Sequence, residues 1–438
     1  MPGSNTLART GGESIFALAK RDGFIAAIFV SLLLLGADEL AIRVAGLSIR
    51  LAFPALLVGC LFLYFQMKEA VAFDKILAWL FFAFALAGAC STFRSYAPTK
   101  SIGYTIWVLF DFFVIIGICY NFARAYAPRT VLSAWLSVFR IHAVLIFLEL
   151  LWGFATHHPS RPKLWFYETS YLAIFMSAYF GSALYLYLRK EAGYRFDFYL
   201  ATIAIIATTS ATGLFGVAFA IALNFLIARQ RVRLLLGTSV LVALSLGTLF
   251  LFFQKTVFFQ LAVGFLFNND DVIHLLLMRG GNRVIRALVG WQAFVQHPWF
   301  GIGIGGDSAY MEQASIPDSA REYLTKYSNL GVGQPFCNIF IEVLGTTGLI
   351  GFIPFIAIIL YAVRRFISQV KGNISVEATA FFIGFFSVLL SLQLEGTVLR
   401  YYLWSPLGLA LGVMARNYTV AWNNEASPSL GAPLLKPR

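Results

Sequence analysis

The stretch RGGNRVIRALVGWQAFVQHPWFGIGIGGDS at residues 279–308, followed by QPFCNIFIEVLGTTGLIG at residues 334–351, holds most of the polar chemistry of this chain. Arg279, Arg283 and Arg286 lie three or four residues apart, so a helix would align them as one cationic stripe. A glycine-rich segment, GIGIGG, comes soon after them. The surrounding sequence is mostly apolar, which predicts a membrane scaffold that presents this stretch.

Composition sets the class of protein. Of 438 residues, 59% are hydrophobic and only 12% are charged, which exceeds what a water-soluble core needs. The formal net charge of +12 could suggest a nucleic-acid partner, but no basic low-complexity arm is present and most Lys and Arg lie in short loops between apolar blocks. We therefore expect no nucleic-acid binding, and we interpret these charges as determinants of membrane topology.

The predicted fold is all-α, a polytopic membrane protein of about twelve transmembrane helices. Residues 1–253 would form the first nine spans, residues 254–337 one large loop on the outer (periplasmic) face with amphipathic helices, and residues 338–438 the last three spans and a cytoplasmic tail. Because the first span is short, an interfacial segment is expected within residues 37–50. Apolar length and charged breaks place the spans near residues 23–38, 51–66, 76–93, 102–122, 131–155, 171–188, 196–210, 213–228, 234–253, 338–361, 377–395 and 401–415.

Basic residues predict the orientation. Successive short loops alternate between rich and poor in Lys and Arg, and the richer set marks the cytoplasm, which places both termini there. Lys20 and Arg21 precede the first apolar run, but no small-residue cleavage pattern follows it, so we expect an uncleaved first span. The large loop has no counterpart in the first half of the chain, which argues against an inverted-repeat transporter.

Residues 282–296 predict an amphipathic helix at the membrane surface. Val284, Leu288, Trp291 and Val295 recur at helical spacing. Guanidinium groups along its edge would lie at headgroup depth and could bind phosphate oxygens bidentately, so a lipid-borne phosphate or diphosphate is the expected ligand. The alternative is that these arginines only reach outward to lipid headgroups. The glycines that follow would let the backbone approach a ligand or the bilayer closely.

The ordered pattern of Arg283, then HPWFGIGIGG at residues 297–306, then CNIFIEVLGTTGLIG at residues 337–351, resembles the O-antigen ligase and O-antigen polymerase (Wzy-type) superfamily of bacterial inner-membrane enzymes. The similarity covers chiefly residues 210–351. It implies a multi-pass protein of the bacterial inner membrane that takes a glycan from undecaprenyl diphosphate on the periplasmic face. The enzyme would be an inverting glycosyltransferase that uses neither a cofactor nor a metal.

The resemblance can be carried to single residues. Arg283 matches the arginine implicated in holding the diphosphate, and Asn338 matches the asparagine of the ligases' His-Asn pair. Two departures favour a different mechanism: Cys337 stands where ligases place the histidine proposed to activate the acceptor, and Ala211 stands where many members have arginine. We therefore predict a polymerase of lipid-linked oligosaccharide repeat units for O-antigen or exopolysaccharide. The alternatives are an O-antigen ligase that transfers glycan to lipid A core and a lipid-linked oligosaccharide transporter or flippase.

The predicted catalytic residues are Arg283 and Glu395. Glu395 is preferred as the base because it closes the eleventh span and Arg400 follows it on the same face. Other base candidates are Glu168, His157, His158, Asp307 and Glu342. The predicted substrate-binding residues are Arg279, Arg283, Arg286, Arg400 and Asn338.

The remaining polar residues are assigned to structure. Cys60, Cys90, Cys119 and Cys337 show no metal-binding spacing, so neither a disulfide nor a zinc site is expected. Ionisable residues inside spans are costly to bury, and a polar seam is favoured over a proton relay for them: Asp111, Arg140, His142 and Glu149. The expected partners are membrane lipids and the undecaprenyl-diphosphate-linked oligosaccharide, with room left for a chain-length regulator protein.

Overall fold

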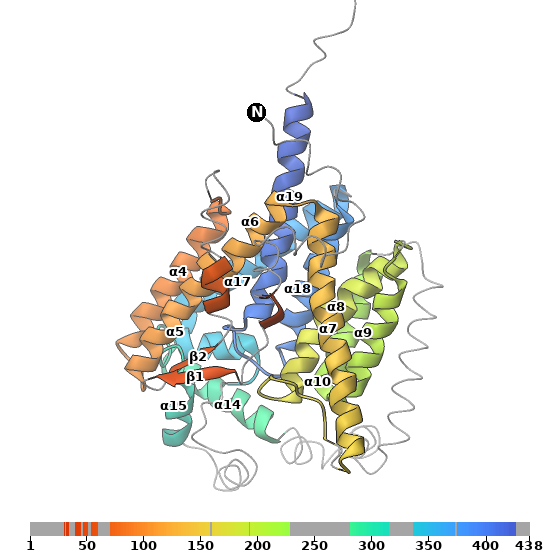
Figure 1. Ribbon diagram of the computed structural model, residues 1–438. Coiled ribbons are helices and arrows are strands. Elements are labelled where there is room, and N and C mark those ends of the chain that lie inside the picture. Colours follow the sequence, from red (N-terminus) through yellow and green to blue (C-terminus); the bar gives the residue numbers. More distant parts are fainter. Residues whose placement is uncertain are drawn as a thin grey trace, which may run out of the picture.

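The computed structural model describes residues 30, 32–34, 40–44, 47–50, 54–59, 71–157, 160–191, 193–227, 281–314, 336–372 and 375–425. Within them the chain is a bundle of apolar helices (Figure 1). Five of these helical segments are long and apolar enough to cross a membrane: Lys75–Thr92, Pro98–Ala125, Pro128–Ala155, Thr169–Leu188 and Ile339–Gly372. The protein is therefore a helical membrane protein.

The described helices follow the predicted spans closely. They are α4 (Lys75–Thr92), α5 (Pro98–Phe110), the π-helix η3 (Asp111–Ile116), α6 (Gly117–Ala125), α7 (Pro128–Ala155), α8 (Thr169–Leu188), α9 (Arg195–Thr208), α10 (Ala211–Ile227), α14 (Gly281–Gln296), α15 (Asp307–Gln313), α17 (Ile339–Gly372), α18 (Val376–Ser391) and α19 (Tyr401–Glu425). Nine predicted spans coincide with them, α5 to α6 forming one. The spans near 23–38 and 51–66 lie mostly, and that near 234–253 wholly, outside the described residues, so the total number of spans stays a prediction.

One short sheet departs from the all-α prediction. Strands β1 (Ala41–Val44) and β2 (Leu47–Arg50) pair antiparallel, with Ala41 opposite Arg50 and Val44 opposite Leu47. The sequence AIRVAGLSIR alternates polar and apolar residues, is rich in β-branched side chains, and leaves two residues between the strands, as a hairpin requires. The segment expected to contain an interfacial piece therefore forms a hairpin, a small addition to a fold that is otherwise helical in the described residues.

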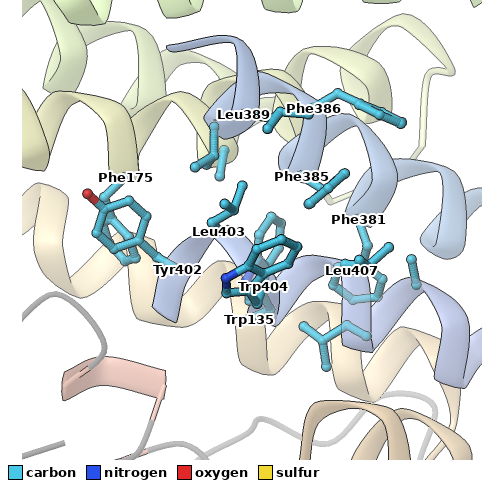
Figure 2. Close-up of a cluster of buried hydrophobic side chains, with 14 of the residues drawn as sticks. Trp135, Phe175, Phe381, Phe385, Phe386, Leu389, Tyr402, Leu403, Trp404 and Leu407 are labelled. Atoms are coloured by element: carbon cyan, nitrogen blue, oxygen red, sulfur yellow. The ribbon is translucent and has the colours of Figure 1, made fainter. Parts of the chain in front are cut away.

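Aromatic packing holds the centre of the bundle. Figure 2 shows rings from α7, α8, α18 and α19 packed together, with Trp404 among them. Trp404 is buried, its ring centroid lies 5.0 Å from that of Phe81, and its Nε1 donates to the Val398 carbonyl at 2.8 Å. Because lipid is as apolar as these side chains, close packing rather than transfer from water favours this arrangement. Small residues allow it: a Cβ on Gly181 of α8 would lie 2.4 Å from the Ser387 hydroxyl of α18.

The ionisable side chains within α7 make structural contacts. Arg140 donates from Nε and Nη2 to the two Asp197 carboxylate oxygens of α9 at 2.7 Å each, and the Tyr179 hydroxyl of α8 donates to the same carboxylate at 2.6 Å. Glu149 accepts the backbone N–H of Leu164 at 2.8 Å and so anchors the α7–α8 connection. These contacts support the prediction of a polar seam.

The Arg140–Asp197 pair gives a prediction about stability. Asp197→Ala leaves the Arg140 guanidinium without its counter-charge, and breaking such a pair costs about 3 kcal/mol or more. Tyr179→Phe removes one hydrogen bond to the same carboxylate and should cost about 1 kcal/mol. Thermal unfolding in detergent, followed by tryptophan fluorescence, should show the larger shift for Asp197→Ala. Equal shifts would mean that Arg140 finds another partner.

Candidate functional site

The site is organised by backbone pairing between two distant segments. Helix α17 is bent at Gly348, where φ is 63° and ψ is −165°. The HPWFGIGIGG segment between α14 and α15 lies against this bend and forms hydrogen bonds with the backbone groups of α17 that the bend leaves unpaired. The pairs are Ile302 N to Gly345 O at 3.1 Å, Gly303 N to Thr346 O at 2.9 Å, Leu349 N to Pro298 O at 2.8 Å and Ile350 N to Trp299 O at 3.2 Å. A bent helix within a membrane needs such partners for its freed backbone groups.

Two glycines make this contact possible. At Gly301, φ is 66° and a Cβ would lie 2.4 Å from the Thr346 carbonyl carbon; at Gly348, a Cβ would lie 2.3 Å from the Trp299 carbonyl carbon. On its other side the segment meets the α4–α5 connection, where Tyr96 N donates to Ile302 O at 3.4 Å. The expectation that these glycines approach a ligand or the bilayer is therefore wrong for Gly301, which approaches another part of the backbone.

Helix α14 has two apolar faces. Ile285 and Val289 are buried against the protein, whereas Leu288, Trp291 and Val295 are exposed and are available to a bilayer. Arg283 and Arg286 are three residues apart on this helix and so lie on neighbouring positions of one face. Arg279, the third member of the predicted stripe, lies outside the described residues.

Arg283 forms an ion pair with Glu395, which lies in the connection between α18 and α19. The side chains differ in accessibility: that of Arg283 is 40% exposed and that of Glu395 only 2%. The two predicted catalytic residues are thus in direct contact although 112 positions separate them. Arg283 is the member of the pair that solvent or a ligand reaches.

Two further arginines flank this pair. Arg400 is buried, and its guanidinium carbon lies 3.8 Å from the centroid of the Tyr171 ring in α8. Arg286 is also buried, and both arginines act electrostatically on the Tyr171 hydroxyl, as does Glu395. The face of an aromatic ring attracts a cation, so Tyr171 orients Arg400. Arg283 is linked to the same group of charges through its ion pair with Glu395.

Glu342 fixes the loop that carries Glu395 and Arg400. Its buried carboxylate on α17 accepts the backbone N–H of Thr397. Thr397 has φ of 81°, an uncommon value for a β-branched residue, and Gly396 beside it has φ of 94°. A Cβ on Gly396 would lie 2.2 Å from the Phe336 carbonyl oxygen. Glu342, one of the candidate bases, therefore has a positioning role.

A cavity of about 390 Å³ opens beside Arg283. It lies between α14, the α7–α8 connection and the α9–α10 turn, and this volume falls within the range of small-molecule sites. Its walls carry cations, an acid, an aromatic ring and hydroxyl groups: Arg161, Lys163, Arg283, Glu168, Tyr167, Thr169, Ser170 and Ser210. Such a lining suits a polar, anionic ligand of sugar size.

Cys337 and Asn338 lie at the start of α17. Burial raises the pKa of the Cys337 thiol to about 12, with nearby Arg286 acting in the opposite direction. The thiol therefore stays protonated at neutral pH and cannot act as a base there. Asn338 has φ of 71°, and its side-chain oxygen accepts the backbone N–H groups of Phe340 at 3.0 Å and Ile341 at 3.3 Å. It caps α17, and its place in substrate binding stays a prediction.

The other candidate bases are Asp307, Glu168, His157 and His158. Burial raises the pKa of the Asp307 carboxyl, while Lys100, with Nζ 3.8 Å from Oδ1, opposes that shift. Glu168 accepts the Ser170 hydroxyl at 3.2 Å and lines the cavity. His157 follows the end of α7 and does not line the cavity, and His158 lies outside the described residues. In the described part of the chain, no group of three His, Cys, Asp or Glu is arranged to hold a metal ion.

Residues 198–356 match the model of a family described as O-antigen ligase. Over this range the chain is similar to the O-antigen ligase family. This match confirms the resemblance, and it spans α9, α10, α14, α15 and the first half of α17, with Arg283, Arg286 and Cys337 inside it. Glu395 and Arg400 lie beyond the matched range and reach the site through the α18–α19 connection. No curated protein sequence matches the chain.

Two parts of the candidate site were not predicted from the sequence. Tyr171 reads as one more apolar residue in a span, although it lies under the Arg400 guanidinium. Arg161 and Lys163 line the cavity, although in the sequence nothing distinguishes them from other basic loop residues. The available signal was their place in the loop immediately before α8, next to the aromatic run Trp165, Phe166 and Tyr167.

The glycine contact gives a prediction with a matched control. Gly301 and Gly193 both have positive φ, but a Cβ at Gly193 would meet no atom within 4 Å. Gly193→Ala therefore measures only the cost of the backbone conformation, about 1 kcal/mol, whereas Gly301→Ala also forces the segment away from α17. Thermal unfolding in detergent should show a clearly larger loss of stability, and transfer activity should fall, for Gly301→Ala alone. Similar behaviour of the two variants would contradict the backbone contact.

Proposed function

We propose that this protein transfers a glycan from a polyprenyl diphosphate carrier to an acceptor hydroxyl. The transfer would take place at the periplasmic end of the helical bundle. We further propose that the protein polymerises lipid-linked oligosaccharide repeat units for O-antigen or exopolysaccharide in the bacterial inner membrane. The observation that carries the proposal is the electrostatic cluster of Arg283, Arg286 and Arg400, in which Arg283 lines a polar cavity and lies within the range that matches the O-antigen ligase family.

The arginines suit a diphosphate. In the transfer, the bond between the anomeric carbon and the diphosphate oxygen breaks, its electron pair leaves with the diphosphate, and the acceptor oxygen forms the new bond. Guanidinium groups donate to phosphate oxygens in pairs and stabilise the charge that develops on the leaving group. Arg283 lines the cavity, and the buried Arg286 and Arg400 add further positive charge to the same electrostatic cluster. Attack from the side opposite the diphosphate gives inversion.

Glu395 is the carboxylate proposed to take the proton of the acceptor hydroxyl. Its carboxylate forms an ion pair with Arg283. A bound diphosphate would recruit the same guanidinium and release the carboxylate at the moment when a base is needed. The neutral thiol of Cys337 cannot do this work, because burial keeps the pKa of that group near 12. The absence of the ligase histidine at this position supports polymerisation over transfer to lipid A core.

Arg283 provides the direct test. In detergent, Arg283→Ala given lipid-linked repeats should extend them about 10²-fold to 10³-fold more slowly, because one group that stabilises the leaving diphosphate is lost. Arg283→Lys should recover only part of the rate, since an ammonium cannot donate in the same bidentate way. Arg94→Ala, at an exposed position in the α4–α5 connection, is the control and should retain full activity. A full rate in Arg283→Ala would refute its assignment.

Glu395 requires a readout that separates a base from a residue that only positions Arg283. If Glu395 accepts the proton, Glu395→Gln should lose most of the single-turnover rate, because a neutral amide is not a base. Glutamine can still accept a hydrogen bond from Arg283, so a role limited to positioning Arg283 predicts a retained rate. Single-turnover rates of the wild type and of Glu395→Gln decide between these outcomes.

The O-antigen ligase description of the matched family favours one second candidate, transfer to lipid A core. Deletion of a polymerase leaves single repeats on the lipid, whereas deletion of a ligase leaves long chains that are not attached to core. A transporter forms no glycosidic bond at all. Lengthened product from purified protein in detergent, where no compartments exist, would therefore exclude transport as the sole function.

A further inference from the structure

A second cationic cavity lies at the other end of the bundle. It has a volume of about 350 Å³ and is formed by the start of α4 and the second half of α17. Its lining contains the cations Lys75, Arg364 and Arg365, together with Asp74 and Tyr361. Three positive side chains against one carboxylate leave a net charge of +2 on the walls.

The position of this cavity follows from the two helices that form it. The connection that follows α4 contacts the HPWFGIGIGG segment (residues 297–306) through Tyr96, and the first turn of α17 carries Glu342 at the candidate site. The 18 residues of α4 span ~27 Å at ~1.5 Å per residue. This length is close to the ~30 Å thickness of bilayer hydrocarbon. The cavity therefore lies at the membrane face opposite the candidate site, which the distribution of basic residues predicts to be cytoplasmic.

The cations are only partly satisfied by the protein. The Arg365 Nη2 lies 3.4 Å from Asp74 Oδ2, while Asp74 also accepts the Leu77 N–H at 3.1 Å and the Tyr361 hydroxyl. The Arg365 Nε is buried and has no hydrogen-bond partner among the residues that the structure describes. Lys75 and Arg364 are exposed and make no ion pair within that same part of the chain. The cavity thus has hydrogen-bond donors and positive charge that an anion could bind, from Arg365, Lys75 and Arg364.

The surroundings point to a lipid. Ile76, which lines the cavity, is exposed, and so are Trp79 one turn further along α4 (72%) and Leu360 on α17 (61%). Exposed apolar side chains at this depth face acyl chains, and tryptophan is typical of the headgroup boundary. Basic pockets between helices at the cytoplasmic side bind anionic headgroups. A ligand with a phosphate in the cavity and a hydrocarbon tail along Trp79 would match both features.

We propose that this cavity binds the phosphate of an anionic phospholipid in the leaflet opposite the candidate site, with Lys75, Arg364 and Arg365 as its ligands. The phosphate accepts hydrogen bonds from the Arg365 Nε and from the two exposed cations, and its acyl chains lie along the α4 and α17 surfaces. This site is separate from the glycan chemistry and holds whether or not the proposed transferase activity is correct.

The test compares lipid binding by full-length protein variants. Delipidated protein is titrated with phosphatidylglycerol or phosphatidylcholine in detergent, and bound lipid is counted by native mass spectrometry. Lys75→Gln/Arg364→Gln should weaken phosphatidylglycerol binding about 30-fold, since two basic contacts are lost. The control, Lys190→Gln/Arg195→Gln, removes exposed basic residues after α8 and at the start of α9, outside the cavity. It should bind as the wild type does.

Three results would overturn the proposal. They are equal binding by the cavity variant and the control, equal binding of phosphatidylcholine and phosphatidylglycerol by the wild type, and binding of soluble glycerol phosphate as tight as that of the lipid. The last would assign the cavity to a free phosphate. Both substituted positions are exposed, so the variants should elute from size exclusion as the wild type does. Arg365→Lys keeps the positive charge but removes the Nε donor, and its binding of phosphatidylglycerol is the second measurement.

Discussion

The bend of α17 at Gly348 is the constraint on which the site depends. A broken helix leaves backbone N–H and C=O groups unpaired, and these are costly in a membrane unless protein groups complete them. The HPWFGIGIGG segment (residues 297–306) forms backbone hydrogen bonds with these groups. Its position along α17 is therefore set by which backbone groups pair, and not by side-chain packing alone. Because α14 ends immediately before this segment, the placement of Arg283 and Arg286 follows from the same contact.

The second requirement is a set of counter-charges for three clustered arginines. Buried like charges are unfavourable unless acids or rings compensate them. Glu395 pairs with Arg283, Tyr171 lies under Arg400, and Asp307 and Glu395 both act electrostatically on Arg286. Glu342 in turn holds the loop that supplies two of these groups. The three arginines are thus held in place by acids and an aromatic ring that come from different elements of the fold.

Much of the helical fold could be predicted because each span is a local property. Apolar length and charged breaks located α7 and α8 to within a few residues, since a membrane helix must satisfy its own backbone and expose apolar side chains all along its length. Residues 41–50 were harder, because ten residues of alternating pattern are too short to distinguish a hairpin from an interfacial turn by periodicity alone. The bend at Gly348 was hidden for another reason: the sequence on either side is helical, and only a distant segment makes the break stable.

In the candidate site, too, the residues with a local sequence pattern could be predicted, and those whose role depends on a distant contact could not. Arg283 and Arg286 could be found because their spacing on α14 is local, and Glu395 and Arg400 because a charged pair at the end of an apolar span is conspicuous. Tyr171 could not be found this way, since its role comes from a guanidinium that lies more than two hundred residues away along the chain. The role of Gly301 also depends on a distant part of the chain. The sequence suggested that it approaches a ligand, whereas the structure shows the backbone of α17 against it. The local sequence therefore predicts the charge of the arginines. Their placement depends on the α18–α19 connection, the Tyr171 ring and the bend at Gly348, which only the fold brings together.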